Sequence, residues 1–196
     1  MTSRLVVNSV RHTGASADAL TLSSDGKVTF PNNTGNILQV KQTVKTSFFS
    51  TATQDSGVDV TGVSVTITPS SSSNKILVSL SGYYGNDNND SFAHLYLVRV
   101  LDGSTDTGIA VGDTRGSTTR ATMGAAFRTG GGQSNNISRH FSCQFLDSPN
   151  TTNAIIYKLR IFATQNGACC VGGSFNDSDD NRVSVPTFIT AMEVAA

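Results

Sequence analysis

The strongest candidate for chemistry in this sequence is the loop NDSDDN, which is rich in carboxylates and amides. Asp177, Asp179 and Asn181 have the alternate spacing that opens a calcium-binding loop, and oxygen atoms are the ligands that Ca²⁺ prefers. An EF-hand then needs a glycine and, at its last position, a bidentate glutamate. This chain has Arg182 and Phe188 at those positions, so the EF-hand is excluded.

A second acidic loop, GNDNND, carries Asp87 and Asp90. An ion shared between this loop and NDSDDN is one interpretation, and two solvated turns are the other. Neither loop supplies a complete ligand set, so we expect no bound metal. No cofactor motif occurs elsewhere, and we expect no cofactor.

Residues for acid–base or nucleophilic catalysis are scarce. Three histidines occur: His12, His94 and His140. A general base needs a nucleophile or a carboxylate within reach, but the neighbours of His94 on one strand face are Phe92 and Tyr96, so we expect a packed histidine. Ser72 and Lys75 form a nominal S-x-x-K, which falls in a serine-rich turn and not at a helix start. No nucleophile elbow, H-E-x-x-H or Walker motif is present, and we expect no enzyme.

Two further features have plain structural interpretations. Cys143, Cys169 and Cys170 are odd in number, and two are adjacent, so they do not form a disulfide framework. We expect three reduced thiols that pack as small apolar side chains. The glycine-rich RTGGGQSNN lacks the lysine and the following helix of a phosphate-binding loop, so we interpret it as a flexible loop.

The composition excludes several classes of partner. Charged residues make up 14% of the 196 residues and the formal net charge is zero. No basic stripe is available to neutralise nucleic-acid phosphates. No apolar run approaches the ~20 residues of a membrane-spanning helix. We therefore expect neither nucleic-acid binding nor membrane insertion.

Apolar residues recur at every second position through most of the chain, which is the periodicity of β-strands. Val63, Val65 and Ile67 share one face of such a run, and KILVSL repeats the pattern after a serine-rich turn. Pro69 lacks a backbone donor, and serine and asparagine favour turns, so we interpret residues 69–75 as a hairpin-type connection.

Similar runs continue to the C-terminal end of the sequence: FAHLYLVRVL, FSCQF, AIIYKLRI and VPTFITAMEV. In the last run, Phe188, Thr190, Met192 and Val194 occupy alternate positions. Many evenly spaced strands with Gly-, Asn- and Ser-rich turns indicate an all-β protein. We predict a jelly-roll-like β-sandwich over residues 37–196.

The first 36 residues differ from the rest of the chain. Two short β-like pieces, ALTLSS and KVTF, are joined by a Ser-Asp-Gly-Lys turn. A segment with so few apolar residues cannot build a core alone. We expect residues 1–36 to be an extended segment for attachment or oligomerisation.

The stretch NSVRHTGASADALTLSSDGKVTFPNNTGNILQV, the SVTITPSSSSNKILV segment and the closing TFITAMEVAA resemble the small fibre and appendage proteins of tailed bacteriophages, marine ones especially. The resemblance covers nearly the whole chain in order, and ITPSSSSNKILV is its most specific part. It implies a virion structural protein, assembled in the bacterial cytoplasm, with an N-terminal attachment segment and a sandwich resembling the trimeric TNF/C1q jelly roll. It implies no catalytic residues.

If the chain is a trimer, FAHLYLVRVL has a further meaning, because it is apolar on both faces. A strand with one solvated face should alternate, so we expect one face of this strand, or of its neighbours, to pack against sister copies.

Three functions remain open: a fibre that contacts a host-surface glycan, a capsid decoration protein that stabilises the shell, and a carbohydrate-binding module. The chain has no Trp, which disfavours the last. Recognition on a β scaffold belongs to loops. The expected contact residues are Tyr83, Tyr84, Asn86, Asp87, Asn135, Asn136 and Asp177.

Overall fold

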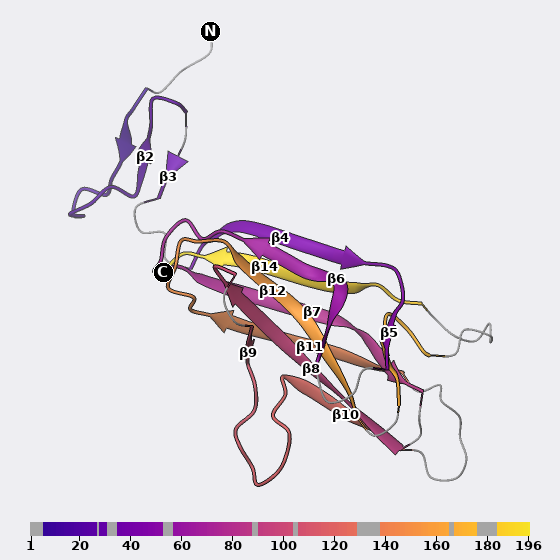
Figure 1. Cartoon of the computed structure of the whole chain (residues 1–196). Coiled ribbons are helices and arrows are strands. Elements are labelled where there is room, and N and C mark those ends of the chain that lie inside the picture. The colour runs from indigo at the N-terminus through magenta and orange to yellow at the C-terminus, as the bar shows by residue number, and fades with distance from the viewer. Residues whose placement is uncertain are drawn as a thin grey trace.

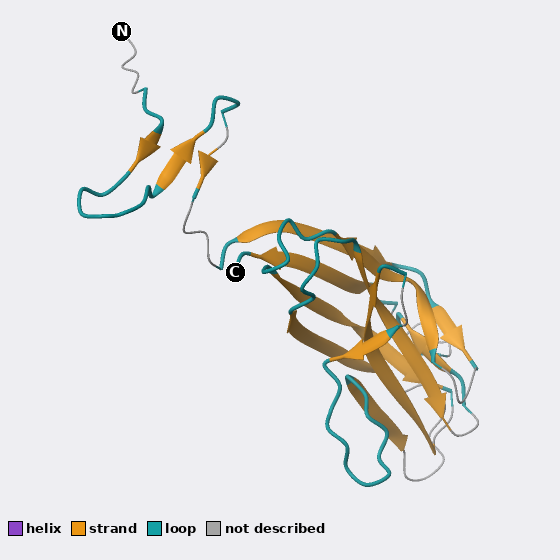
Figure 2. Ribbon diagram, turned by 60° about the vertical axis from the view of Figure 1, so that its left-hand side comes forward, coloured by secondary structure: helices purple, strands orange, loops and turns teal. Residues whose placement is uncertain are grey.

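The computed structural model describes residues 6–26, 28–30, 35–52, 57–87, 90–103, 106–128, 138–164, 167–175 and 184–196. Within these residues the regular structure consists of β-strands, and Figure 2 shows them as a sandwich with a small separate sheet. The described part of the chain contains no helix that could span a membrane. The predicted all-β fold class is confirmed.

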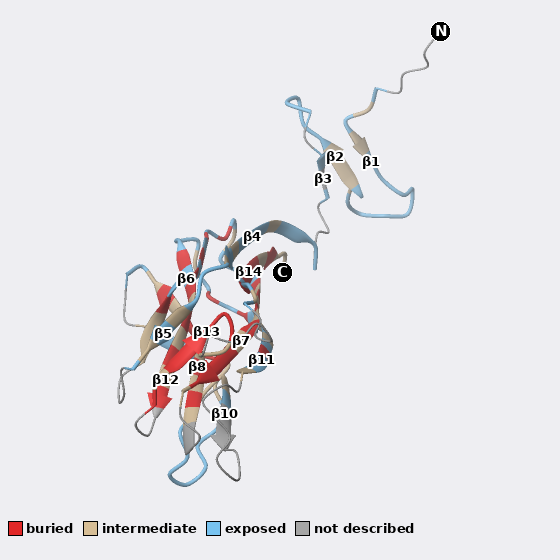
Figure 3. Cartoon of the chain, turned by 90° about the vertical axis from the view of Figure 1, so that its right-hand side faces the viewer, coloured by how far each residue is buried: buried red, intermediate tan, exposed pale blue. Residues whose placement is uncertain are grey.

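The N-terminal segment forms a small antiparallel sheet of β1 (Ser9–Val10), β2 (Leu20–Leu22) and β3 (Val28–Thr29). The two predicted β pieces correspond to β2 and β3, and the turn between them includes Gly26 at φ 81°. Strand β1 was not predicted. This sheet stands apart from the sandwich in every view (Figures 1–3).

Two antiparallel sheets form the sandwich. Sheet I has the order β4 (Ile37–Lys45), β14 (Thr187–Val194), β7 (Lys75–Asn86), β13 (Cys169–Val171) and β5 (Phe49–Thr51), with β11 (Ser138–Asp147) also paired with β7. Sheet II has the order β10 (Met123–Arg128), β8 (Asp90–Leu101), β12 (Ile155–Thr164) and β6 (Val58–Ile67), with β9 (Thr107–Ile109) paired with β8.

The chain passes repeatedly from one sheet to the other, as a jelly-roll-like sandwich requires. Strand β6 belongs to sheet II and β7 to sheet I, and the same change occurs between β7 and β8, between β10 and β11, and between β11 and β12. The predicted hairpin at residues 69–75 is therefore wrong, because this turn connects the two sheets. Alternation specifies which side chains are buried but not which strand is the partner.

The core lies between the two sheets and follows the alternation of the sequence (Figure 3). Val63, Val65 and Ile67 of β6 are buried, as predicted. In β14 the buried residues are not the alternate set named in the sequence analysis but the other one, and Ile189 and Ala191 face the core. Phe188, Thr190, Met192 and Val194, which mark this run in the sequence, lie on the outward face. Both sets of alternate residues in TFITAMEV contain apolar side chains, so the alternation does not specify which set is buried.

Two polar groups connect the sheets inside the sandwich. Arg99 Nη1 of β8 donates to Asp147 Oδ1 of β11 at 2.7 Å and to Oδ2 at 3.0 Å. Tyr157 Oη of β12 donates to Asp147 Oδ2 at 2.7 Å. Burial, and then the bond to Asp147, raise the pKa of Tyr157. A buried carboxylate is tolerated where a cation and a hydroxyl both satisfy it.

A second buried carboxylate belongs to Glu193 of β14, which is 1% exposed. The serine turn surrounds it: Ser70 N and Ser70 Oγ donate to Oε1 at 2.6 and 2.7 Å, and Asn74 Nδ2 donates at 2.7 Å. Gln39 Nε2 of β4 donates to Oε2 at 2.6 Å. The turn therefore holds the last strand of the fold, a role that its plain composition did not indicate.

Candidate functional site

Two of the predicted contact loops, GNDNND and RTGGGQSNN, begin and end at one end of the sandwich. Strand register shows this directly, because Asp90 pairs with Arg128, and Gly85 pairs with Ser138. Cys169 pairs with Asn86, the last residue of β7. The ends of GNDNND and RTGGGQSNN therefore meet there.

The N-terminal segment joins the sandwich at the opposite end, beside the C-terminal residues (Figure 1). Gly35 N donates to Ala195 O at 2.7 Å, and Ala195 N donates to Asn36 O at 2.9 Å. Strand β4 begins here, with Ile37 paired to Val194. The two ends of the sandwich therefore differ. The N-terminal sheet joins one end, and the strands that lead into GNDNND and RTGGGQSNN end at the other.

The predicted contact residues of β7 do not all reach solvent. Tyr83 is half-buried on the outward face of sheet I, where its ring stands edge-on to His140 at 5.4 Å. Tyr84 and Asn86 are 3% and 2% exposed. Their expected place on an exposed surface is therefore corrected: the alternation of β7 continues beyond GYY, which turns both side chains inward.

Asp87 is bound to the backbone of a neighbouring connection. Its Oδ1 accepts from Ala168 N at 2.6 Å, and its own N donates to Ala168 O at 3.0 Å. This exchange closes the end of the sandwich between β7 and β13.

The remaining predicted site residues lie outside the described residues: Asn135, Asn136, Asp177, Asp179 and Asn181. Within the described ranges, no three His, Cys, Asp or Glu side chains are placed to hold a metal ion.

The outward face of β8 carries a site that the sequence did not reveal. Val98 and Val100, which point outward, are only 2% and 9% exposed. Residues 110–122, between β9 and β10, lie beside this face and form cavity walls with it. The apolar character of both faces of β8 is thus explained in part within one chain, and it is not by itself evidence for sister copies.

Two adjacent cavities on this face share Arg120. One, of about 320 Å³, has Tyr96, Val98 and Phe162 among its walls. The other, of about 400 Å³, is lined by residues that include Phe92, His94, Asp113 and Thr119. We call this pair of cavities the sheet II groove.

Hydrogen bonds fix the 110–122 segment that walls the groove. Thr122 Oγ1 accepts from Leu97 N at 3.0 Å and donates to Ile109 O at 2.9 Å, so it fills the gap between β9 and β10 along the edge of β8. Arg120 Nε donates to Gly112 O at 2.6 Å, which closes the segment on itself. Its guanidinium is held at the place where the two cavities meet.

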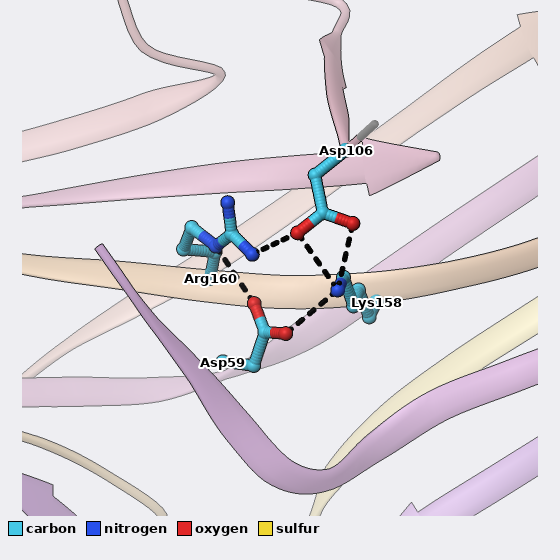
Figure 4. A network of polar contacts seen from close by, with 4 residues as sticks. All are labelled: Asp59, Asp106, Lys158 and Arg160. Atoms are coloured by element: carbon cyan, nitrogen blue, oxygen red, sulfur yellow. Dashed lines mark hydrogen bonds and ion pairs between the residues drawn. The ribbon is translucent and has the colours of Figure 1, made fainter. Parts of the chain in front are cut away.

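Next to the groove, four charged side chains form a network on the outward face of sheet II (Figure 4). Lys158 Nζ lies 2.7 Å from Asp59 Oδ2 and 3.0 Å from Asp106. Arg160 Nε lies 2.7 Å from Asp59 Oδ1, and its Nη2 also contacts Asp106. Two cations and two carboxylates thus neutralise one another.

This network keeps both carboxylates ionised. Burial raises the pKa of Asp59, but the hydrogen bonds from Arg160 and Lys158 outweigh it and lower the pKa. The bond from Lys158 is the main cause of the lowered pKa of Asp106. A general acid needs the opposite shift, so this pair is unsuited to donate a proton at neutral pH.

The cysteines match the expected free thiols. Burial raises the pKa of Cys169 and Cys170 to about 12, and it also raises the pKa of Cys143. A thiol that stays protonated is a poor nucleophile.

The groove was missed for a reason visible in the strands. The sequence predicts a packed histidine at position 94; His94 is half-buried and lines the groove, as does its neighbour on the same strand face, Tyr96. Burial lowers the pKa of His94, which favours the neutral ring. Tyr96 and Phe162 come together only through the pairing of β8 with β12, in which Tyr96 is opposite Arg160 and Phe162 is opposite His94.

No family model and no curated protein match this chain. Solved structures with similarity include three from infectious bursal disease virus. A structure of its Gx strain is 13% identical over 96% of this chain and 43% of that chain, with a TM-score of 0.40. A mutant VP2 protein of the virus in derived T=1 particles is 14% identical over 96% and 41%, with a TM-score of 0.41. A VP2 subviral particle is 15% identical over 96% and 42%, with a TM-score of 0.37. This chain spans less than half the length of those chains, and similarities of this size carry no argument about its function.

Proposed function

We propose that this chain is a non-enzymatic virion structural protein: a trimeric bacteriophage fibre or appendage that attaches by residues 1–36 and presents its sandwich to the host surface. The observation that carries the proposal is the placement of the N-terminal sheet at one end of the sandwich and of the strand ends that lead into GNDNND and RTGGGQSNN at the other. An appendage needs one end to attach and another to meet its target. The resemblance of the sequence to phage appendage proteins supports the same function.

The chemistry of the described side chains supports a non-enzymatic role. The carboxylates of Asp59 and Asp106 are ion-paired, and Asp147 and Glu193 are bound inside the sandwich. These groups stabilise the fold, and they are not arranged as an acid and a base around a substrate.

The trimer has a candidate interface on the outward face of sheet I. Val40, Met192, Leu77 and Leu146 lie in register across four neighbouring strands. Val40 and Leu146, at the two ends of this row, are 53% and 47% exposed. We call this row the apolar band. A contiguous row of apolar side chains that is exposed to solvent is a candidate interaction site.

Sister copies are the occupant that the chain itself favours for the apolar band. Exposed apolar side chains continue from the N-terminal sheet into β4: Val10, Leu22, Val28, Phe30, Ile37 and Leu38. The N-terminal sheet cannot bury these residues alone. If three N-terminal segments associate about an axis, the β4 strands that follow them directly are brought to the same axis. The net charge of the chain is zero, so electrostatic repulsion between the copies is small.

The trimer is tested by light scattering of the purified chain at micromolar concentration. A trimer is expected, and Val40→Asp should dissociate it because a charge at an apolar interface is costly. Ile156→Asp is the matched control, since Ile156 is 39% exposed on the outward face of sheet II. A monodisperse monomer, or equal effects of the two substitutions, would reject the trimer through this face.

The position of the protein on phage particles and its role in host contact are tested by electron microscopy of the labelled full-length protein and by adsorption to host cells. The label should lie on an appendage that points away from the particle, and adsorption to host cells should fall when the protein is missing. Undiminished adsorption would reject the host-contact role. A loss of capsid resistance to heat would instead favour the decoration protein.

A further inference from the structure

We propose that the sheet II groove binds a neutral oligosaccharide, with Tyr96 and Phe162 as the floor and Arg120 and Asp113 as the groups that bind hydroxyls. The inference deepens the proposed function and rests on it in one respect: it takes the sandwich to meet a glycan-bearing host surface. It moves recognition from the loops at the tip of the sandwich to the face of sheet II.

The smaller cavity of the groove has an aromatic floor. The rings of Tyr96 and Phe162 lie with centroids 5.2 Å apart and planes tilted by 55°. Both side chains are half-buried, so their edges are fixed by packing while part of each ring still faces the cavity. Fixed rings provide a large contact area at a small cost in conformational entropy.

The polar groups of the groove include a donor and an acceptor that the protein does not use. Arg120 has a protein partner for its Nε, namely Gly112 O. Among the described residues, no carboxylate pairs with Arg120 and no cation pairs with Asp113. Both side chains are exposed and line the larger cavity, and Arg120 also lines the cavity that contains Tyr96 and Phe162.

This combination matches a sugar better than other small ligands. A sugar ring has an apolar face of C–H groups, which packs on an aromatic ring, and a rim of hydroxyls that both donate and accept. A guanidinium supplies donors and a carboxylate supplies acceptors, so together they bind hydroxyls without favouring a charged ligand. The cavity volumes of about 320 and 400 Å³ suit one or two sugar units each.

The charge around the groove also disfavours an acidic glycan. Arg160 lines the same cavity but is neutralised by Asp59 and Asp106. Asp113 and Arg120 both line the larger cavity, so their formal charges sum to zero there. The groove therefore has no net positive charge with which to attract a carboxylate or a sulfate.

The test is binding of the purified full-length chain to an array of neutral, sialylated and uronate-containing oligosaccharides, followed by calorimetric titration with the strongest binder. Tyr96→Ala and Arg120→Ala should each weaken binding about tenfold or more. Tyr96→Phe, which keeps the ring, should retain most of the affinity. Tyr83→Ala is the matched control, because Tyr83 is a half-buried tyrosine on the opposite sheet.

Each outcome decides the inference. Binding of a neutral glycan that is lost in Tyr96→Ala and Arg120→Ala and kept in Tyr83→Ala supports it. Binding confined to acidic glycans, binding that the groove substitutions leave unchanged, or no binding to the array overturns it. Arg120 is exposed and lies outside the core, so Arg120→Ala should leave the sandwich folded, and an unchanged unfolding temperature separates its loss of binding from loss of folding. The proposed function fails separately, if imaging does not find the protein on the particle.

Discussion

Ser70 Oγ donates to Glu193 Oε1 at 2.7 Å, and this bond joins the turn after β6 to the last strand of the fold. Asn74 strengthens the connection from both sides, because its Nδ2 also donates to Glu193 and its Oδ1 accepts from Ala196 N at 3.3 Å. A turn of four serines and an asparagine thus acts as a clamp on the C-terminal strand. Among the described residues no cation pairs with this buried carboxylate, so its stability depends on these hydrogen bonds.

The clamp predicts that neighbouring serines differ in importance. Ser70→Ala should lower the free energy of unfolding by about 1–3 kcal/mol, because it leaves a buried carboxylate with one donor fewer. Ser71→Ala should change it by less than about 0.5 kcal/mol, since Ser71 Oγ contacts only Ser73 within the turn. Urea unfolding of both variants measures the difference, and equal effects would contradict the clamp.

The same carboxylate predicts how stability depends on pH. Burial raises the pKa of Glu193, but hydrogen bonds from Asn74, Gln39 and Ser70 outweigh it and hold the pKa below its ordinary value of 4.5. A lowered pKa in the folded state stabilises the protein above the pKa of the unfolded state, and this stability is lost as pH falls through the folded pKa. The free energy of unfolding should therefore fall in acid.

Glu193→Gln isolates this contribution. Asp59 and Asp106 have lowered pKa values as well, so the variant should show a weaker fall in stability between about pH 5 and pH 3, and not a flat profile. Urea unfolding across this range compares the two slopes. Identical slopes would mean that the pKa of Glu193 does not differ between the folded and unfolded states.

Two glycines predict a contrast in packing. A Cβ at Gly82 of β7 would lie 2.8 Å from Thr187 Oγ1 and 2.9 Å from Phe141 Cζ, both in the interior of the sandwich. Gly82→Ala should therefore cost about 1–3 kcal/mol. At Gly112 a Cβ would meet no atom within 4 Å, so Gly112→Ala should be close to neutral. Thermal unfolding of the two variants tests the close approach at β7.

Adjacent isoleucines of β12 test the orientation of sheet II. Ile155 is fully buried, whereas Ile156 is 39% exposed. Ile155→Ala should lower the free energy of unfolding by about 2–5 kcal/mol. Ile156→Ala should lower the free energy of unfolding by well under half of that amount, because folding removes less apolar surface from water at this position. The reverse order would place the core on the other face of the sheet.

Much of the strand pattern could be predicted from the sequence. The alternation of Val63, Val65 and Ile67 is a local property with a period of two residues, and so is that of β12. In TFITAMEV the same signal fails, because Phe188 and Ile189 are both apolar and either frame can face a core. The pattern identifies a strand there but not its buried side.

The sequence by itself determined the all-β class, the position of most strands and the zero net charge, since each depends on composition or on neighbours along the chain. Only the tertiary structure decided the contacts between distant residues. Asp59 and Lys158 are 99 positions apart, and Ser70 and Glu193 are 123 apart. The groove likewise needs Tyr96, Phe162 and Arg120 from three segments. Such contacts exist only after the strands have chosen their partners, and that choice follows from packing the whole sandwich, which no local pattern encodes.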